Sequence, residues 1–152
     1  MILFLDFDGV LHPDPCSDES LLLSELPLLE SVLHDCQHVD VVITSTWRLK
    51  RSITRLRDLF SPSLRERIID VTPERRDFQD LAETIGHTYQ RSIEIEAWLR
   101  SSREPWRPWI ALDDRPEWFR PFCKNLVRCD PATGLTASTA LELRRRFTLG
   151  KI

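Results

Sequence analysis

Five short apolar segments, separated by longer stretches, most constrain what this 152-residue chain can fold into. They are residues 2–7, 39–44, 68–71, 109–112 and 126–127. The segments are rich in Val and Ile and do not alternate apolar with polar residues. This pattern is typical of strands that are covered on both faces, as in a parallel sheet. We therefore predict five interior strands.

The longer stretches carry helical patterns, and we predict helices over residues 27–36, 49–60, 92–102 and 136–147. Pro27 suits the first turn of the first helix. Residues 93–96 also alternate like a strand, but the length of the third stretch favours a helix. Thr136 is expected to cap the fourth helix, where the arginines at 144–146 lie at the negative end of the helix dipole.

Strands that alternate with helices predict an α/β fold, because the connection between parallel strands is a right-handed crossover. We expect a three-layer Rossmann-like domain with a mostly parallel central sheet. The chain has no internal repeat and no change of composition that would mark a second domain. Residues 1–152 are therefore predicted to form a single domain.

The composition argues against a disordered chain or a membrane protein. Apolar residues make up 41% of the chain and charged residues 30%, with a net charge of −3, as in ordinary globular proteins. The opening residues MILFL are only five apolar residues that run directly into Asp6, too few for a signal peptide or a membrane span. We expect a cytoplasmic protein.

Acidic and hydroxyl side chains follow three of the predicted strands. These residues are Asp6 and Asp8, Thr44 and Ser45, and Asp113 and Asp114. If the three strands are neighbours, the acids meet at one edge of the sheet, where two carboxylates ~4 Å apart repel by about 4 kcal/mol at an effective dielectric constant of ~20. Oxygen ligands of this kind suit Mg²⁺. A turn at Asp8–Gly9 would explain those two residues alone, but not Asp6.

Three segments at these strand ends resemble motifs of one protein family. FLDFDGV (residues 4–10), VVITSTWR (41–48) and WIALDD (109–114) are similar to the first, second and fourth motifs of the haloacid dehalogenase-like (HAD) superfamily of Mg²⁺-dependent phosphohydrolases. The three motifs occur in the family's order, and the resemblance extends over residues 2–127.

The resemblance implies a role for each acid. Asp6 would be the nucleophile that forms an aspartyl-phosphate, and Asp8 the general acid and base. Asp6, Asp8, Asp113 and Asp114 would hold the Mg²⁺ ion. A carboxylate is already ionised at neutral pH, so it attacks phosphorus without activation by a base.

The resemblance also implies phosphate-binding residues. The hydroxyl of the second motif is assigned to Thr44, with Ser45 as the alternative. The third motif is usually a Lys, but this chain has Arg91 at the start of the predicted third helix. Arg75, Arg76 and Arg103 are the alternatives to Arg91.

The chain leaves little room for the cap domain that many HAD phosphatases carry. An open site is associated with polymeric substrates, which here would be nucleic-acid ends or phosphoproteins. TSTWR also resembles the small capless branch that is linked to RNA repair. Three nearby arginines, Arg48, Arg51 and Arg55, are candidates for contact with a nucleic-acid backbone, which rewards clustered positive charge.

Three functions therefore remain open from the sequence. The first is a Mg²⁺-dependent phosphatase with a phosphorylated, polymeric substrate. The second is a small-molecule phosphatase, for example one that acts on nucleotides. The third is a non-catalytic module that binds phosphate or nucleic acid on the same fold.

Overall fold

A single parallel sheet forms the centre of the protein. The computed structural model describes residues 1–74 and 89–150, and their strands are ordered β3-β2-β1-β4-β5. The strands are β1 (Ile2–Leu5), β2 (Asp40–Ile43), β3 (Ile68–Val71), β4 (Trp109–Asp113) and β5 (Leu126–Arg128). All four neighbouring pairs are parallel. The predicted strands and the parallel α/β fold are therefore confirmed.

Helices and 3-10 turns connect the strands. The α-helices are α1 (Leu26–Asp35), α2 (Ile53–Arg57), α4 (Gln90–Ser101) and α5 (Ala137–Leu149). The 3-10 turns are η1 (Glu19–Leu21), η2 (Thr46–Leu49), η3 (Pro62–Arg67) and η5 (Pro116–Trp118). Three predicted helices are confirmed, including the last, where the Thr136 side chain accepts a hydrogen bond from the Thr139 amide.

The helix predicted over residues 49–60 was wrong for most of its length. Residues 46–49 form the 3-10 turn η2, and α-helix resumes only for the five residues of α2. The Ser52 side chain accepts a hydrogen bond from the Arg55 amide and starts α2 there. A serine that bonds to the nearby backbone competes with helix continuation, so helical spacing of the apolar residues was not sufficient.

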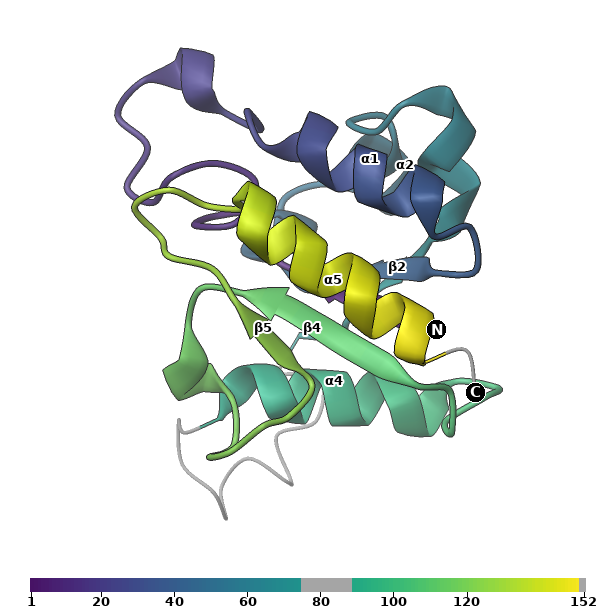
Figure 1. Cartoon of the computed structure of the whole chain (residues 1–152). Coiled ribbons are helices and arrows are strands. Elements are labelled where there is room, and N and C mark those ends of the chain that lie inside the picture. Colours follow the sequence, from purple (N-terminus) through teal and green to yellow (C-terminus); the bar gives the residue numbers. More distant parts are fainter. Residues whose placement is uncertain (75–88, 151–152) are drawn as a thin grey trace.

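The helices cover both faces of the sheet, with α4 on one face and α1, α2 and α5 on the other (Figure 1). Leu3 and Leu5 of β1 pack in the core beneath α1, α2 and α5. Ile2 and Phe4 pack with Ile95 of α4 on the opposite face. This alternation follows from the two-residue period of a strand, and the three layers confirm the Rossmann-like architecture. The described residues contain no cap domain.

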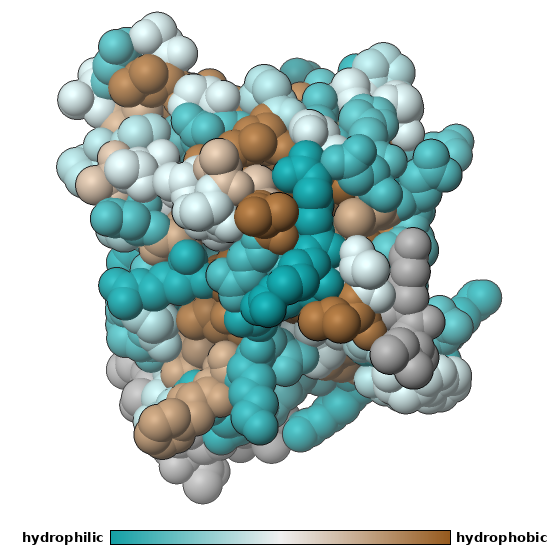
Figure 2. Space-filling view, viewed as in Figure 1, coloured by the Kyte–Doolittle hydropathy of each residue, from teal (hydrophilic) through white to brown (hydrophobic). Residues whose placement is uncertain are grey.

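On the face of the molecule where α5 lies, polar and apolar side chains are unevenly distributed. Hydrophilic side chains run down the middle of this face of the molecule, and apolar ones form small separate patches (Figure 2). Within residues 1–74 and 89–150, no helix is long and apolar enough to cross a membrane.

Candidate active site

The carboxyl ends of three central strands meet at one edge of the sheet. Strand β1 lies between β2 and β4, and backbone hydrogen bonds continue past the strand ends. The Asp6 amide donates to the Leu112 carbonyl at 3.1 Å, and the Thr44 amide donates to the Leu5 carbonyl at 2.8 Å. The predicted neighbourhood of these three strand ends is therefore present.

Three of the four predicted acids form a tight group at this edge. One carboxylate oxygen from each of Asp6, Asp113 and Asp114 lies within 4.8 Å of the others. All three residues are buried. The alternation of β1 and β4 directs Asp6 and Asp113 to the face that α4 covers, because they follow Phe4 and Ala111 by two residues.

Burial strongly affects the ionisation of this group. Desolvation, followed by repulsion from Asp6, raises the pKa of Asp113 to about 7 and that of Asp114 to about 6. Desolvation also raises the pKa of Asp6, although the Arg91 cation opposes the shift. For the described residues, the cost of burial therefore exceeds the stabilisation that nearby positive charges give to the ionised carboxylates.

The donor set fits a divalent cation. Four buried carboxylates, those of Asp6, Glu94, Asp113 and Asp114, are grouped with the guanidinium groups of Arg48 and Arg91. When all four acids are ionised, their negative charge exceeds the positive charge of these two guanidinium groups by two. Within the described part of the chain, the buried Oδ1 of Asp114 also has no hydrogen-bond partner. Hard oxygen ligands with an excess of negative charge are what Mg²⁺ requires.

Arg91 is the cation that holds the acids together. Its Nε donates to Asp113 Oδ2 at 3.0 Å, and its Nη1 binds Glu94 Oε2 at 2.9 Å and the Thr44 carbonyl. Its Nη2 lies 3.4 Å from Asp6 Oδ2 but makes no hydrogen bond. Among the described residues, the buried Nη2 group therefore has no hydrogen-bond partner, although it lies beside Asp6.

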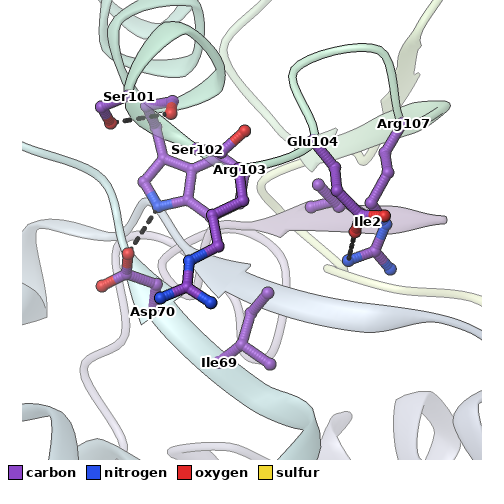
Figure 3. Close-up of a pocket in the computed structure, with 9 residues that line it drawn as sticks. Ile2, Ile69, Asp70, Ser101, Ser102, Arg103, Glu104 and Arg107 are labelled. Carbon is purple, nitrogen blue, oxygen red and sulfur yellow. Dashed lines mark hydrogen bonds and ion pairs between the residues drawn. The ribbon is translucent and has the colours of Figure 1, made fainter.

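The alternatives to Arg91 are placed elsewhere or are not described. Arg103 lies beyond the C-terminal end of α4, about 18 Å along the helix from Arg91 at 1.5 Å per residue. There it lines a separate cavity of about 310 Å³ together with Asp70 (Figure 3). Arg75 and Arg76 lie outside the described residues. Of the two candidates that the structure describes, Arg91 is therefore the one that contacts the acids.

Thr44 and Ser45 are both buried, but they contribute differently. Ser45 lies close enough to Asp6 to lower the pKa of that carboxyl against the larger effect of burial. Thr44 provides its backbone carbonyl to Arg48 and Arg91. Which of the two hydroxyls binds phosphate stays a prediction.

Asp8 lies apart from the group of three acids, which does not include its carboxylate. Its Oδ1 accepts a hydrogen bond from Trp47 Nε1 at 3.2 Å and lies 3.1 Å from His12 Nε2. The side chain is 37% exposed. An acid that is fixed by neighbours and open to solvent is suited to meet a substrate; its role as a metal ligand stays a prediction.

Gly9 lets the chain pass close to the acids. Its φ of 71° lies in the left-handed region, which glycine adopts without steric cost. A Cβ atom at this position would lie 2.4 Å from Asp114 Oδ2. Both the turn and the close approach therefore require glycine.

Glu94 is a site residue that the sequence did not indicate. It is fully buried and binds Arg91 on one side and Arg48 Nη2, at 2.9 Å, on the other. Arg48 is also turned inward: its side chain is only 3% exposed, and its Nε donates to the Thr72 carbonyl at 2.9 Å. The spacing of Arg91 and Glu94 by three residues on one helix was the available signal.

Comparison with known proteins identifies a family to which the chain is similar. Residues 2–140 match the family described as the HAD domain in Swiss Army Knife RNA repair proteins. No curated protein and no solved structure shows significant similarity to the chain. The match spans the three motifs, the strand-end acids and Arg91. The chain therefore belongs to the family of HAD domains that occur in Swiss Army Knife RNA repair proteins.

Proposed function

We propose that this protein is a Mg²⁺-dependent phosphoric monoester hydrolase that acts through an aspartyl-phosphate intermediate. The observation that carries the proposal is the position of Asp6, which is buried between Asp114, Asp113 and the Arg91 guanidinium at the carboxyl edge of the sheet. Family membership supports hydrolase activity in general.

In this mechanism the Asp6 carboxylate attacks the phosphorus atom of the substrate, and the bond between phosphorus and the leaving oxygen breaks. Asp6 needs no base, because the ionised carboxylate is already the nucleophile. Asp113 and Asp114, with Asp6, would hold the ion. When bound, Mg²⁺ supplies positive charge that keeps Asp6 ionised and offsets the charge of the phosphoryl oxygens.

Asp8 carries the proton transfers. Its partly exposed carboxyl group gives a proton to the leaving oxygen, and then accepts a proton from the water that attacks the aspartyl-phosphate. The second attack breaks the bond between phosphorus and the Asp6 oxygen, which releases phosphate and restores the carboxylate. In this proposal, Arg91 Nη2 and the Ser45 hydroxyl bind phosphoryl oxygens, which is supported by the lack of a hydrogen-bond partner for Nη2 in the described residues and by the effect of Ser45 on the pKa of Asp6.

We assign a polymeric substrate, and a nucleic-acid end in preference to a phosphoprotein. Two observations support this assignment: the family's description names RNA repair, and the described residues contain no cap domain over Asp8. A small-molecule phosphatase is the alternative enzyme. A binding module without catalysis is the alternative from another class.

The test is hydrolysis of p-nitrophenyl phosphate with and without Mg²⁺, by the wild type, Asp6→Asn and the control Asp58→Asn. The Asp58 side chain is 55% exposed and forms a surface ion pair with Arg65, so the control changes the same chemical group outside the site. We expect Mg²⁺-dependent hydrolysis that Asp6→Asn reduces by at least about 1,000-fold, because the nucleophile is lost.

A substrate panel would then separate the remaining alternatives. It contains nucleotides, sugar phosphates, phosphopeptides, and oligonucleotides with a 3′- or 5′-phosphate. Fastest turnover of nucleotides would favour the small-molecule phosphatase. Absence of metal-dependent activity on every substrate would favour the binding module.

A further inference from the structure

A pocket of about 360 Å³ opens beside Asp8. Its lining consists of Asp8, Thr46, Trp47, Lys50 and Arg51. If Asp8 protonates the leaving oxygen, as the proposed function requires, this pocket lies on the leaving-group side of the scissile bond. The pocket also adjoins the C-terminal end of β2. Thr46 and Trp47, which line it, are the first residues of η2, and Ser45 is the N-cap of that turn.

Two cations of the pocket are unpaired within the described part of the chain. Lys50 and Arg51 are exposed, and no carboxylate of residues 1–74 or 89–150 makes an ion pair with either side chain. By contrast, the side chain of Arg48 in the same segment is buried against Glu94. The segment therefore offers two positive charges to a ligand at this position.

Trp47 fixes the relation between these cations and Asp8. Its Nε1 donates to Asp8 Oδ1 at 3.2 Å, while the Arg51 guanidinium carbon lies 4.1 Å from the centre of its ring. The ring also packs edge-on against Phe7, which is fully buried, with 5.3 Å between ring centres. Stacking on a ring that is held in this way orders Arg51 and leaves its N–H groups free for an anion.

The nature of the contacts indicates which anion is bound. Because Arg51 covers one face of Trp47, that face does not present a free surface for a stacked base. The pocket instead presents two cations and the Thr46 hydroxyl, which are groups that bind phosphate oxygens. A ligand that reaches Asp8 with one phosphate and these cations with another must carry a second phosphate on its leaving group.

We propose that Trp47, Lys50 and Arg51 form a subsite for the phosphodiester next to the phosphorylated end of a polynucleotide. A polynucleotide carries such a second phosphate in every case, whereas a phosphopeptide carries none at a fixed position. This inference rests on the proposed function and adds the group that the enzyme recognises beyond the scissile phosphate. Recognition through phosphates predicts little dependence on base sequence.

The experiment compares the wild type with the double variant Lys50→Gln/Arg51→Gln and the control Arg145→Gln. Arg145 is exposed on α5, outside the proposed site. The substrates are p-nitrophenyl phosphate, a nucleoside monophosphate, a nucleoside 3′,5′-bisphosphate and a short single-stranded oligonucleotide with a terminal phosphate. For each, kcat/KM is measured at several salt concentrations.

We expect the double variant to lose at least about 10-fold in kcat/KM on the oligonucleotide, since two phosphate contacts are removed. Its activity on p-nitrophenyl phosphate should remain within about 2-fold of the wild type, as that substrate lacks the second phosphate. The slope of log(kcat/KM) against log[salt] should become shallower by about 0.7, since one phosphate is no longer neutralised. Arg145→Gln should behave as the wild type on every substrate.

Equal losses on all substrates, or no loss on the oligonucleotide, would overturn the subsite. If the double variant loses as much kcat/KM on the bisphosphate as on the oligonucleotide, that result would overturn the polynucleotide and assign the subsite to a small molecule with two phosphates. Fluorescence anisotropy with a labelled, phosphorylated oligonucleotide gives a second readout that needs no turnover. If the wild type hydrolyses nothing but binds this probe through Lys50 and Arg51, the proposed catalysis fails while the subsite stands.

Discussion

A buried arginine is stable only where acidic groups surround it, and Arg91 shows this at the scale of single residues. It is 1% exposed although it is the second residue of α4. Burial alone would lower its pKa, but Asp6, Asp113 and Glu94 together raise it. Glu94 also binds the buried Arg48, whose pKa desolvation lowers. A single carboxylate thus supports two buried cations.

Replacement of this carboxylate should therefore be costly. We expect Glu94→Gln to lower the free energy of unfolding by about 3 kcal/mol, since the buried guanidinium of Arg48 loses the carboxylate with which it pairs. Glu96→Gln is the matched control, because Glu96 lies two residues further along α4 in a partly exposed pair with Arg120; its effect should stay below about 1 kcal/mol. Urea unfolding measures both, and equal stability of the two variants would contradict the role given to Glu94.

Gly9 provides a second prediction at this scale. Gly9→Ala should lower the free energy of unfolding by about 1–2 kcal/mol, the cost of a left-handed conformation for a residue with a side chain. It should also weaken Mg²⁺ binding, because the new Cβ displaces the Asp114 carboxylate. Gly134→Ala, at a φ of 69° and with its new Cβ 2.7 Å from the Val10 carbonyl oxygen, is the control that adds backbone strain and a close contact away from Asp114. Calorimetric titration that gives the same Mg²⁺ affinity for both variants would refute the effect on Asp114.

At the scale of elements, capping side chains decide where helices start. Ser52 interrupts what the apolar spacing suggested was one long helix, and the break between η2 and α2 leaves Lys50 and Arg51 outside regular helix. Both residues line the pocket beside Asp8 as a result. Helix α5 also starts at a side chain that accepts a hydrogen bond from a backbone amide, that of Thr136, and this cap was evident from the sequence.

The Thr136 cap can be tested directly. Thr136→Ala should lower the free energy of unfolding by about 1 kcal/mol, because the Thr139 amide loses its acceptor. Thr136→Ser keeps the hydroxyl and should restore most of the stability. Helix α5 packs Leu143 and Phe147 into the core, so the loss should appear in the global unfolding transition. A serine variant as unstable as the alanine variant would exclude the cap as the cause.

At the scale of the whole molecule, the fold collects negative charge at one edge and leaves part of it uncompensated. The folded pKa values of about 7 for Asp113 and about 6 for Asp114 exceed the unfolded value near 3.9. Between these pH values the folded protein binds more protons than the unfolded chain. Stability of the metal-free protein must then fall as pH rises from about 4 to 7.

We accordingly expect the melting temperature in EDTA to be higher at pH 5.5 than at pH 8. Added Mg²⁺ should raise it more at pH 8, where the acids are ionised and bind the cation. Asp114→Asn should reduce both the pH dependence and the Mg²⁺ effect, and thereby separate this site from other titrating groups. Differential scanning fluorimetry tests the expectation, which a pH-independent melting temperature in EDTA would contradict.

The sequence by itself determined the strands, the parallel sheet, and the gathering of acids at one edge. These features depend on local period and on a general rule, since parallel strands all end at the same edge. Asp6, Asp113 and Asp114 could therefore be identified from the order of the residues alone. Three motifs in order also indicated the family that the match over residues 2–140 confirms.

Only the tertiary structure decided which side chains meet across the layers. The pairing of Glu94 with Arg48, the bond from Trp47 to Asp8, and the effect of Ser45 on the pKa of Asp6 join residues from different elements. Such contacts depend on how α4 and η2 pack against the sheet, which no local pattern encodes. The physical reason is that periodicity specifies the face on which a residue lies, whereas packing specifies the partner that it meets there.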